Sequence, residues 1–238
     1  MSFHYSPKII TDGLVLYLDA ANPLSYVSGT TSWLSINRIP STGVLTNGPT
    51  FNSGNGGSIV FDGTNDYVEL TNNSPVQFAG LSEITLEAVI QPTSFSGSGN
   101  RFIYAQFLTP GSTMCGIYLN TSGKFLFGYR DNIQNNSGAI KSVTSNTTLN
   151  LNTTYHVTAT FKAGVQTTLY INGIYDAGSI QSNPISSLTP DFIRIGRLFT
   201  DGFDFYKGNI YVVKTYKRAL SSIEVLQNYN ATKTRFGL

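Results

Sequence analysis

Residues 56–70 read GGSIVFDGTNDYVEL, and in this stretch apolar residues alternate with polar ones on both sides of a polar turn. Ile59 and Phe61 precede the turn, and Val68 and Leu70 follow it. The glycine inside the turn can adopt a positive φ, and its Asp and Asn neighbours can bond their own backbone. The stretch therefore predicts a β-hairpin within an antiparallel sheet.

Similar short apolar runs recur along the chain after an irregular segment that extends to about Pro49. Asn172-Gly173 is a strong two-residue hairpin signal, so Ile174 is expected to pair back towards Tyr170 or Ile171. Many short strands separated by Gly and Asn are typical of a β-sandwich or jelly roll. Besides the opening pair, strands are predicted at residues 14–18, 84–90, 102–107, 116–120, 124–129, 155–161, 168–171, 192–195 and 209–216.

One short helix is predicted near the C-terminus. Ser221 can cap it, and Glu224 stands three residues further on, as a capping box requires. Ile223, Leu226 and Tyr229 recur at helical spacing, so they are expected to share the buried face. The predicted helix is expected to seal one end of the sandwich.

Several further stretches, in their order along the chain, resemble successive motifs of the laminin-G-like, concanavalin A-like lectin/glucanase jelly roll. The resemblance is closest to the copies found in tailed-phage virion proteins, and it implies an all-β fold of two antiparallel sheets. Asp19 matches an acid that ends the first strand in relatives, and it is predicted to be an internal hydrogen-bonding group. The stretches are GLVLYLDAANPLSY (13–26), LEAVIQP (86–92), HVTATF (156–161), TTLYINGIYDAG (167–178), FIRIG (192–196) and YKRALSSIEVLQNYNATKTRFGL (216–238).

The composition is that of one neutral domain. No shift in composition divides the 238 residues, so residues 1–238 are predicted to form one domain, with tails at 1–12 and 231–238. A net charge of +2, without a Lys or Arg cluster, argues against nucleic-acid binding. No secretory signal or membrane-spanning run is recognised, and Cys115 is expected to be a buried thiol. Such a neutral surface leaves a homo-oligomer open.

Glycoside hydrolysis is the enzymatic alternative that this fold suggests. It requires two carboxyl groups about 5 Å apart for retention, or about 6.5 to 9.5 Å for inversion. Glu83 and Glu87 would share a solvated strand face about 13 Å apart, which is too far. Two carboxylates from different strands remain an open alternative. Neither His4 nor His156 lies in a nucleophile motif, so no catalytic residue is predicted and the chain is expected not to be an enzyme.

Asp62 and Asp66 are candidate calcium ligands, and Asp201 with Asp204 form a second candidate pair. Calcium prefers carboxylate and carbonyl oxygens, and members of this superfamily often bind it on loops at the sandwich rim. The alternative is a turn in which these side chains bond their own backbone. No cofactor is expected to be required, but calcium remains open.

The segment FTDGFDFYK (199–207) is the candidate glycan site. Its aromatic side chains can stack on sugar rings, its acids can bond sugar hydroxyls, and loops on rigid sandwiches often carry binding. Core packing of the aromatic residues is the alternative. The candidate residues are Asp201, Phe203, Asp204, Phe205 and Tyr206.

These observations predict a non-catalytic component of a phage virion surface, either a capsid decoration or a fibre-associated module. It would fold in the host cytoplasm, bind other virion subunits, and bind host-surface glycans as a further expectation. A free carbohydrate-binding lectin and a glycoside hydrolase are the alternatives.

Overall fold

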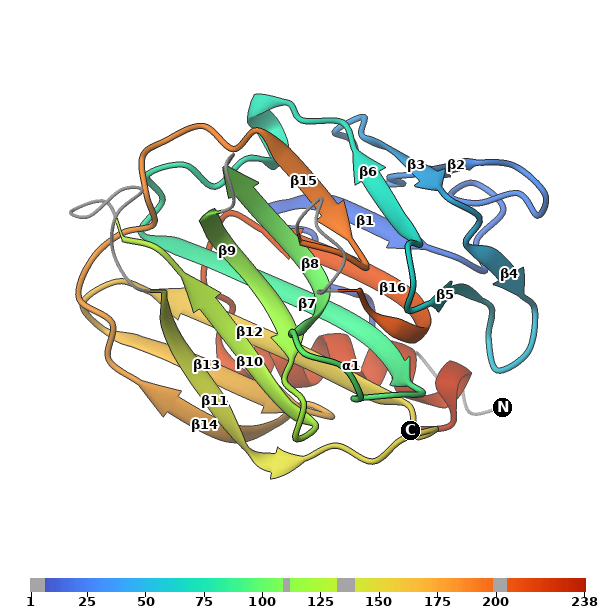
Figure 1. The fold of residues 1–238 in the computed structure, drawn as a ribbon. Helices are drawn as coiled ribbons and strands as arrows, with labels where there is room; N and C mark the ends of the chain where they lie inside the picture. The colour runs from blue at the N-terminus through green and yellow to red at the C-terminus, as the bar shows by residue number, and fades with distance from the viewer. Residues whose placement is uncertain (1–6, 109–111, 132–139, 199–204) are drawn as a thin grey trace, which may run out of the picture.

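Two antiparallel sheets stack face to face, with helix α1 on the outer side of one of them (Figure 1). The structure is a computed structural model and describes residues 7–108, 112–131, 140–198 and 205–238. Within this part of the chain each sheet has eight strands, and every registered strand pair is antiparallel. The predicted jelly-roll sandwich is therefore confirmed.

We name the two layers sheet A and sheet B. Sheet A contains β1 (Leu14–Asp19), β4 (Thr50–Asn52), β5 (Ser58–Asp62), β7 (Glu83–Pro92), β12 (Tyr155–Lys162), β13 (Gln166–Ile171), β14 (Ile174–Ser179) and β16 (Lys207–Tyr216). Sheet B contains β2 (Ser32–Leu34), β3 (Thr42–Thr46), β6 (Tyr67–Leu70), β8 (Arg101–Leu108), β9 (Ser112–Leu119), β10 (Lys124–Tyr129), β11 (Lys141–Thr148) and β15 (Phe192–Ile195). The helical segments are η1 (Ser74–Val76) and α1 (Ser222–Phe236).

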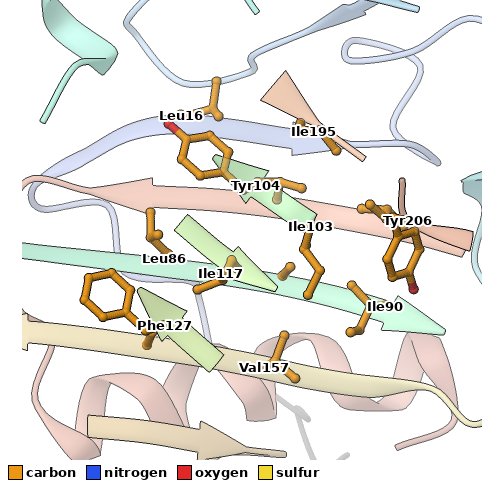
Figure 2. Close-up of a cluster of buried hydrophobic side chains, with 14 of the residues drawn as sticks. Leu16, Leu86, Ile90, Ile103, Tyr104, Ile117, Phe127, Val157, Ile195 and Tyr206 are labelled. Carbon is orange, nitrogen blue, oxygen red and sulfur yellow. The ribbon is translucent and has the colours of Figure 1, made fainter. Parts of the chain in front are cut away.

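The main core lies between the two sheets (Figure 2). Leu86 and Val157 point into it from sheet A, and Ile103, Ile117 and Phe127 meet them from sheet B. Each of these side chains is fully buried. Because alternate residues of a strand face the same side, the period-two pattern in the sequence places one apolar face of each sheet against the other. Removal of this apolar area from water stabilises the sandwich.

The opening stretch does not form the predicted hairpin. β5 pairs with β4 and β16 in sheet A, whereas β6 pairs with β3 and β15 in sheet B. The polar turn at residues 63–66 therefore carries the chain from one layer to the other. Phe61 and Val68 both belong to the main core, so the same alternation of apolar residues suits two strands in different layers. Sequence periodicity reports which face is buried, not which strand lies alongside.

Strands also occur where the sequence gives little apolar signal. The predicted irregular segment contains β2 and β3, and β11 was not predicted at all. In β11 only Val143 and Ser145 are buried, and its other positions are polar. An edge strand with one buried apolar side chain lacks the alternation on which the prediction depends. The predicted return of Ile174 is confirmed, because it pairs with Ile171.

Helix α1 begins at the predicted capping box, but its position on the sandwich differs from the predicted one. The Ser221 hydroxyl accepts a hydrogen bond from the Glu224 backbone, and the Glu224 carboxylate accepts one from the Ser221 backbone, at 3.3 and 2.8 Å. The helix does not seal an end of the sandwich; it lies across the outer face of sheet A, behind β7 and β12 in Figure 1. It is not long and apolar enough to span a membrane, and no other helix of the described residues is.

The buried face of α1 differs from the predicted one. Ile223 and Leu226 are 76% and 43% exposed, whereas Asn228 and Thr232 are buried. Val225 and Phe236 complete the buried face. The prediction failed because this helix covers polar side chains of the sheet, so part of its inner face is polar as well.

We expect Ser221→Ala to lower the free energy of unfolding by about 1 kcal/mol, because the first turn of α1 loses its side-chain cap. Urea denaturation followed by circular dichroism measures this difference. Ser222→Ala is the matched control, since Ser222 lies inside the helix and is expected to change stability by less than about half as much. Equal losses in the two variants would contradict the role of the cap.

Beneath α1 lies a group of polar side chains that we call the buried ion cluster: Glu87, His156, Lys214, Tyr216 and Asn228. All five are at most 1% exposed. One Glu87 oxygen pairs with the Lys214 ammonium and lies 3.0 Å from His156 Nε2. The other accepts a bond of 2.7 Å from the Asn228 amide, which also donates to the Tyr216 hydroxyl at 3.0 Å. Burial alone would raise the pKa of Glu87, but Lys214 and His156 hold it well below its ordinary value.

Two stretches that were predicted to be terminal tails, residues 1–12 and 231–238, contribute residues that pack near the buried ion cluster. The Ile10 backbone donates to the Asn228 side chain at 2.8 Å and accepts from the Tyr216 hydroxyl at 3.1 Å. Residues 231–236 continue α1, where the Arg235 guanidinium binds both oxygens of Asp19 at 2.7 and 2.6 Å. Asp19 is therefore an internal hydrogen-bonding group, as predicted.

Candidate functional site

The turn between the layers fixes the positions of Asp62 and Asp66. One Asp62 oxygen accepts from the Thr64 and Asn65 backbones at 2.7 and 3.3 Å. An Asp66 oxygen accepts from the Asp62 backbone at 3.0 Å. Although partial burial opposes it, the backbone donors lower the pKa of Asp62, whereas burial raises the pKa of Asp66. These contacts are those of an Asx-stabilised turn.

The described residues supply few free ligands for calcium at this turn. Calcium takes six to eight oxygen ligands, and here two carboxylates are available, each already bonded to the turn's own backbone. No group of three or more His, Cys, Asp or Glu side chains suited to a metal occurs in the described part of the chain.

We expect a chelator to leave the thermal unfolding midpoint unchanged. A bound ion would stabilise the folded state by an amount that grows with its concentration. Differential scanning fluorimetry with excess EDTA, and then with excess CaCl₂, measures the midpoint directly. A calcium-dependent rise of several degrees that Asp62→Asn abolishes would contradict this expectation.

The predicted aromatic loop is only partly described. Asp201, Phe203 and Asp204 lie outside the described residues. Phe205 is 6% exposed and Tyr206 is fully buried. Tyr206 lies in the main core (Figure 2). Burial therefore corrects the prediction for Tyr206, which offers no face for sugar stacking, and it leaves only 6% of Phe205 exposed.

Tyr206 and Phe205 have structural partners instead. The Tyr206 ring meets Phe61 edge to face at 6.2 Å, and its hydroxyl donates to the Asn209 carbonyl at 3.2 Å. The Phe205 ring lies under the Arg197 guanidinium at 4.9 Å. Core packing, the alternative considered from the sequence, accounts for Tyr206, whereas Phe205 packs against Arg197 outside the main core.

Even so, Asp62 and Phe205, one described residue from each predicted site, line the same hollow. Lys207, which follows the aromatic loop, is paired with Asp62 in the β16–β5 register. The hollow has a volume of about 250 Å³, and we call it the rim hollow. It is lined by Asp62, Gly63 and Thr64 from the turn, Ser94, Ser96, Gly97 and Ser98 from the loop after β7, and Arg101, Phe205 and Lys207.

Hydrogen-bonding groups dominate the rim hollow. The Arg101 guanidinium donates to the carbonyls of Ser96 and Gly99, which fixes the serine-rich loop against β8. The hydroxyls of Ser94 and Ser96 bond each other at 2.7 Å. Lys207 is exposed, and its ammonium has no hydrogen-bond or ion-pair partner among the described residues. A cation, several hydroxyls and one carboxylate suit a ligand rich in hydroxyl groups.

The sequence reasoning missed the serine loop and Arg101, and it included Lys207 in the candidate segment 199–207 without naming it as a binding residue. The run SFSGSG at residues 94–99 is the signal that was present, because a Ser/Gly-rich segment between two strands indicates an exposed loop. The loop lies close to the turn at residues 62–66 because the chain passes from sheet A to sheet B at that turn. The hairpin prediction placed both strands in one sheet and so did not anticipate this proximity.

The acids elsewhere are engaged in structural contacts. Glu83 pairs with Lys162 at 2.7 Å, Glu69 with Arg194 at 2.5 Å, and Glu224 with Arg218 at 2.6 Å. Every Asp and Glu of the described residues has a hydrogen-bond, ion-pair or electrostatic partner. His156 belongs to the buried ion cluster, and burial raises the pKa of the Cys115 thiol well above its ordinary value. These groups hold the fold together.

The fold is a jelly-roll β-sandwich of two antiparallel sheets. A laminin G profile of the Concanavalin A-like lectin/glucanases superfamily matches residues 62–226. The chain belongs to this superfamily. Among curated protein sequences, none matches it.

Solved structures share the fold at low sequence identity. The binding domain of Paraclostridial Mosquitocidal Protein 1 has a TM-score of 0.68 and 16% identity, over 92% of this chain and 52% of that one. Trypanosoma rangeli sialidase in complex with sialic acid has a TM-score of 0.68 and 17% identity, over 98% and 36%. Domain 4 of AbnA, a GH43 extracellular arabinanase from Geobacillus stearothermophilus in complex with arabinotriose, has a TM-score of 0.66 and 14% identity, over 91% and 98%. The chain thus spans about half of the first structure and about a third of the sialidase.

Proposed function

We propose that this chain is a non-catalytic binding module that holds glycans at the rim hollow. The observation that carries the proposal is the combination of an unpartnered ammonium on Lys207 with the hydroxyls of a serine-rich loop and the carboxylate of Asp62. Sugar hydroxyls both donate and accept hydrogen bonds, so they match such a mixed set. The hollow is smaller than the 300 to 1,000 Å³ typical of drug-sized ligands, which suits a single sugar residue.

Structural relatives support a binding role. The arabinanase domain was solved with arabinotriose, and the sialidase with sialic acid. A binding role also agrees with the engagement of the described acids, because a hydrolase needs two carboxyl groups at a set separation around a scissile bond. Hydrolysis of a polysaccharide remains the alternative that experiment must address.

We further propose that the module serves on a phage virion surface, as a capsid decoration or a fibre-associated component. The support is the resemblance of the ordered sequence motifs to copies in tailed-phage virion proteins. A virion component needs contact area and stability rather than a reactive group. We expect the protein to co-purify with assembled phage particles in a stoichiometric amount. If the protein were absent from purified particles, a free lectin would describe it better.

We expect Lys207→Ala to weaken glycan binding at least tenfold without unfolding the chain. Removal of a charge-assisted hydrogen bond costs about 1.5 to 3 kcal/mol, and 1.4 kcal/mol corresponds to a factor of ten. A glycan array identifies the ligand, and titration calorimetry then compares the variants. Lys8→Ala is the matched control, since Lys8 is also exposed and its side chain has no partner among the described residues. Unchanged affinity in Lys207→Ala would overturn the assignment of the rim hollow.

A further inference from the structure

A second hollow lies beside β1, away from the rim. It has a volume of about 740 Å³, and we call it the apolar groove. Its apolar lining comes from two stretches of the chain: Ile9, Leu14 and Tyr17 from residues 9–17, and Ile36 and Ile39 from residues 36–39. A volume within 300 to 1,000 Å³ and a mostly apolar lining are typical of small-molecule sites.

Hydrogen bonds hold the groove open on the side of residues 35–39. The Ile36 backbone donates to the Tyr17 carbonyl at 2.9 Å, and the Tyr17 backbone donates to the Ser35 hydroxyl at 2.9 Å. The Asn37 amide donates to the Leu14 carbonyl at 3.3 Å. This segment therefore runs along β1 as a fixed wall.

The part of the lining around Ile9 is fixed by contacts with α1 and β16. The Lys8 carbonyl accepts from the Gln227 side chain at 2.7 Å, and Ile10 is bonded on both sides by Asn228 and Tyr216. A ligand would enter a site that is already formed, so little ordering free energy would be lost on binding.

One charge borders the groove. Arg38 lines it, is exposed, and has no hydrogen-bond or ion-pair partner among the described residues. The other lining side chains are uncharged, including Thr11 and Asn37. A guanidinium beside an apolar surface complements a ligand with an apolar body and an acidic group, because its planar donors bind carboxylate or sulfonate oxygens.

We propose that the apolar groove binds a small apolar molecule that carries one acidic group. This site is independent of the rim hollow. Leu14 pairs with Tyr216, and Asp62 pairs with Lys207, at the two ends of β16. Ten residues of extended chain place these ends about 30 Å apart.

Two fluorescent probes test the proposal. One is 1-anilinonaphthalene-8-sulfonate, which is apolar and acidic, and the other is N-phenyl-1-naphthylamine, which has the same aromatic rings without the acid. The full chain is expected to bind one molecule of the acidic probe saturably. Arg38→Ala should weaken binding of the acidic probe by about tenfold or more and leave binding of the neutral probe unchanged.

Ile36→Trp should fill the groove and remove binding of both probes, with an unchanged circular dichroism spectrum as proof of folding. Lys162→Ala is the charge control, because Lys162 pairs with Glu83 away from the groove and is expected to leave both affinities unchanged. Unsaturable binding of several probe molecules, or equal affinity in Arg38→Ala, would overturn the proposal. So would a dimer that Ile36→Trp dissociates, since the groove would then be a contact between copies.

Discussion

Glu87→Gln is expected to lower the free energy of unfolding by about 3 to 5 kcal/mol, the usual cost of removing one partner from a buried ion pair. The substitution conserves size but leaves the Lys214 ammonium buried without its counter-charge. It also removes the charge that faces His156 at 3.0 Å. Urea denaturation at neutral pH, followed by circular dichroism, measures the loss.

Glu83→Gln is the matched control on the same strand. Glu83 pairs with Lys162, but that lysine is 48% exposed and Glu83 is 35% exposed. Water screens such a pair, so its loss is expected to cost less than about 1 kcal/mol. Equal destabilisation by the two substitutions would contradict the distinction between a buried and a solvated carboxylate on β7.

The contribution of Glu87 to the free energy of unfolding should also depend on pH. Because the pKa of this carboxyl is lower in the folded than in the unfolded chain, its stabilisation is fully present above the ordinary value of about 4.3. It is lost as the pH falls below that value towards the folded-state pKa. The stability difference between the wild type and Glu87→Gln should therefore shrink on acidification from pH 7 to pH 3. A difference that grows would contradict the direction of the shift.

Gly208→Ala is expected to cost about 3 to 5 kcal/mol, through a strained backbone and an overpacked contact together. Gly208 has a φ of +137°, and a Cβ built there would lie 2.2 Å from the Gln91 carbonyl oxygen. It would also lie 3.0 Å from the Pro92 Cα, so two central strands of sheet A would have to separate. The unfolding free energy from urea denaturation tests this.

Gly80→Ala isolates the effect of the backbone. Gly80 has a φ of +71°, but the nearest atom to an added Cβ would be 3.9 Å away. Only the left-handed conformation is then penalised, by about 1 to 2 kcal/mol. If Gly208→Ala cost no more than Gly80→Ala, the close approach of β7 and β16 at this point would be refuted.

Alternation of apolar residues was enough to predict the class of fold. The runs at residues 124–129 and 192–195 coincide with β10 and β15, because both strands bury one face against the main core. It was not enough to predict pairing, since β5 and β6 show the expected pattern but belong to different sheets. The alternation of apolar residues is a local property of the sequence, whereas strand partnership depends on contacts between distant segments.

The polar side chains were harder to predict. Glu87 was expected on a solvated face, because a charged residue at an alternating position usually points to water. Helix α1 and the segment around Ile10 cover that face instead, and Asn228 supplies one of the bonds that the buried carboxylate needs. Whether a strand face is solvated depends on an element about 140 residues later in the chain, which no local pattern reports.

The candidate site was predicted in part. Asp62 lines the rim hollow, but Tyr206 faces the core, because an aromatic residue beside a strand packs inward as readily as it faces solvent. Lys207 reaches Asp62 through the β16–β5 register, and the serine loop reaches Lys207 through the β16–β7 register. Their proximity to Asp62 follows from three-dimensional pairing rather than from any motif.

Native mass spectrometry tests the central claim, that the chain holds a glycan at the rim hollow without cutting it. The chain is incubated for a day with the glycan that the array selects, and the complex and the free glycan are then weighed. A complex of one chain with one intact glycan, strongly depleted in Lys207→Ala, is the predicted result. Shortened glycan products, or a complex equally abundant in Lys207→Ala, would contradict the account.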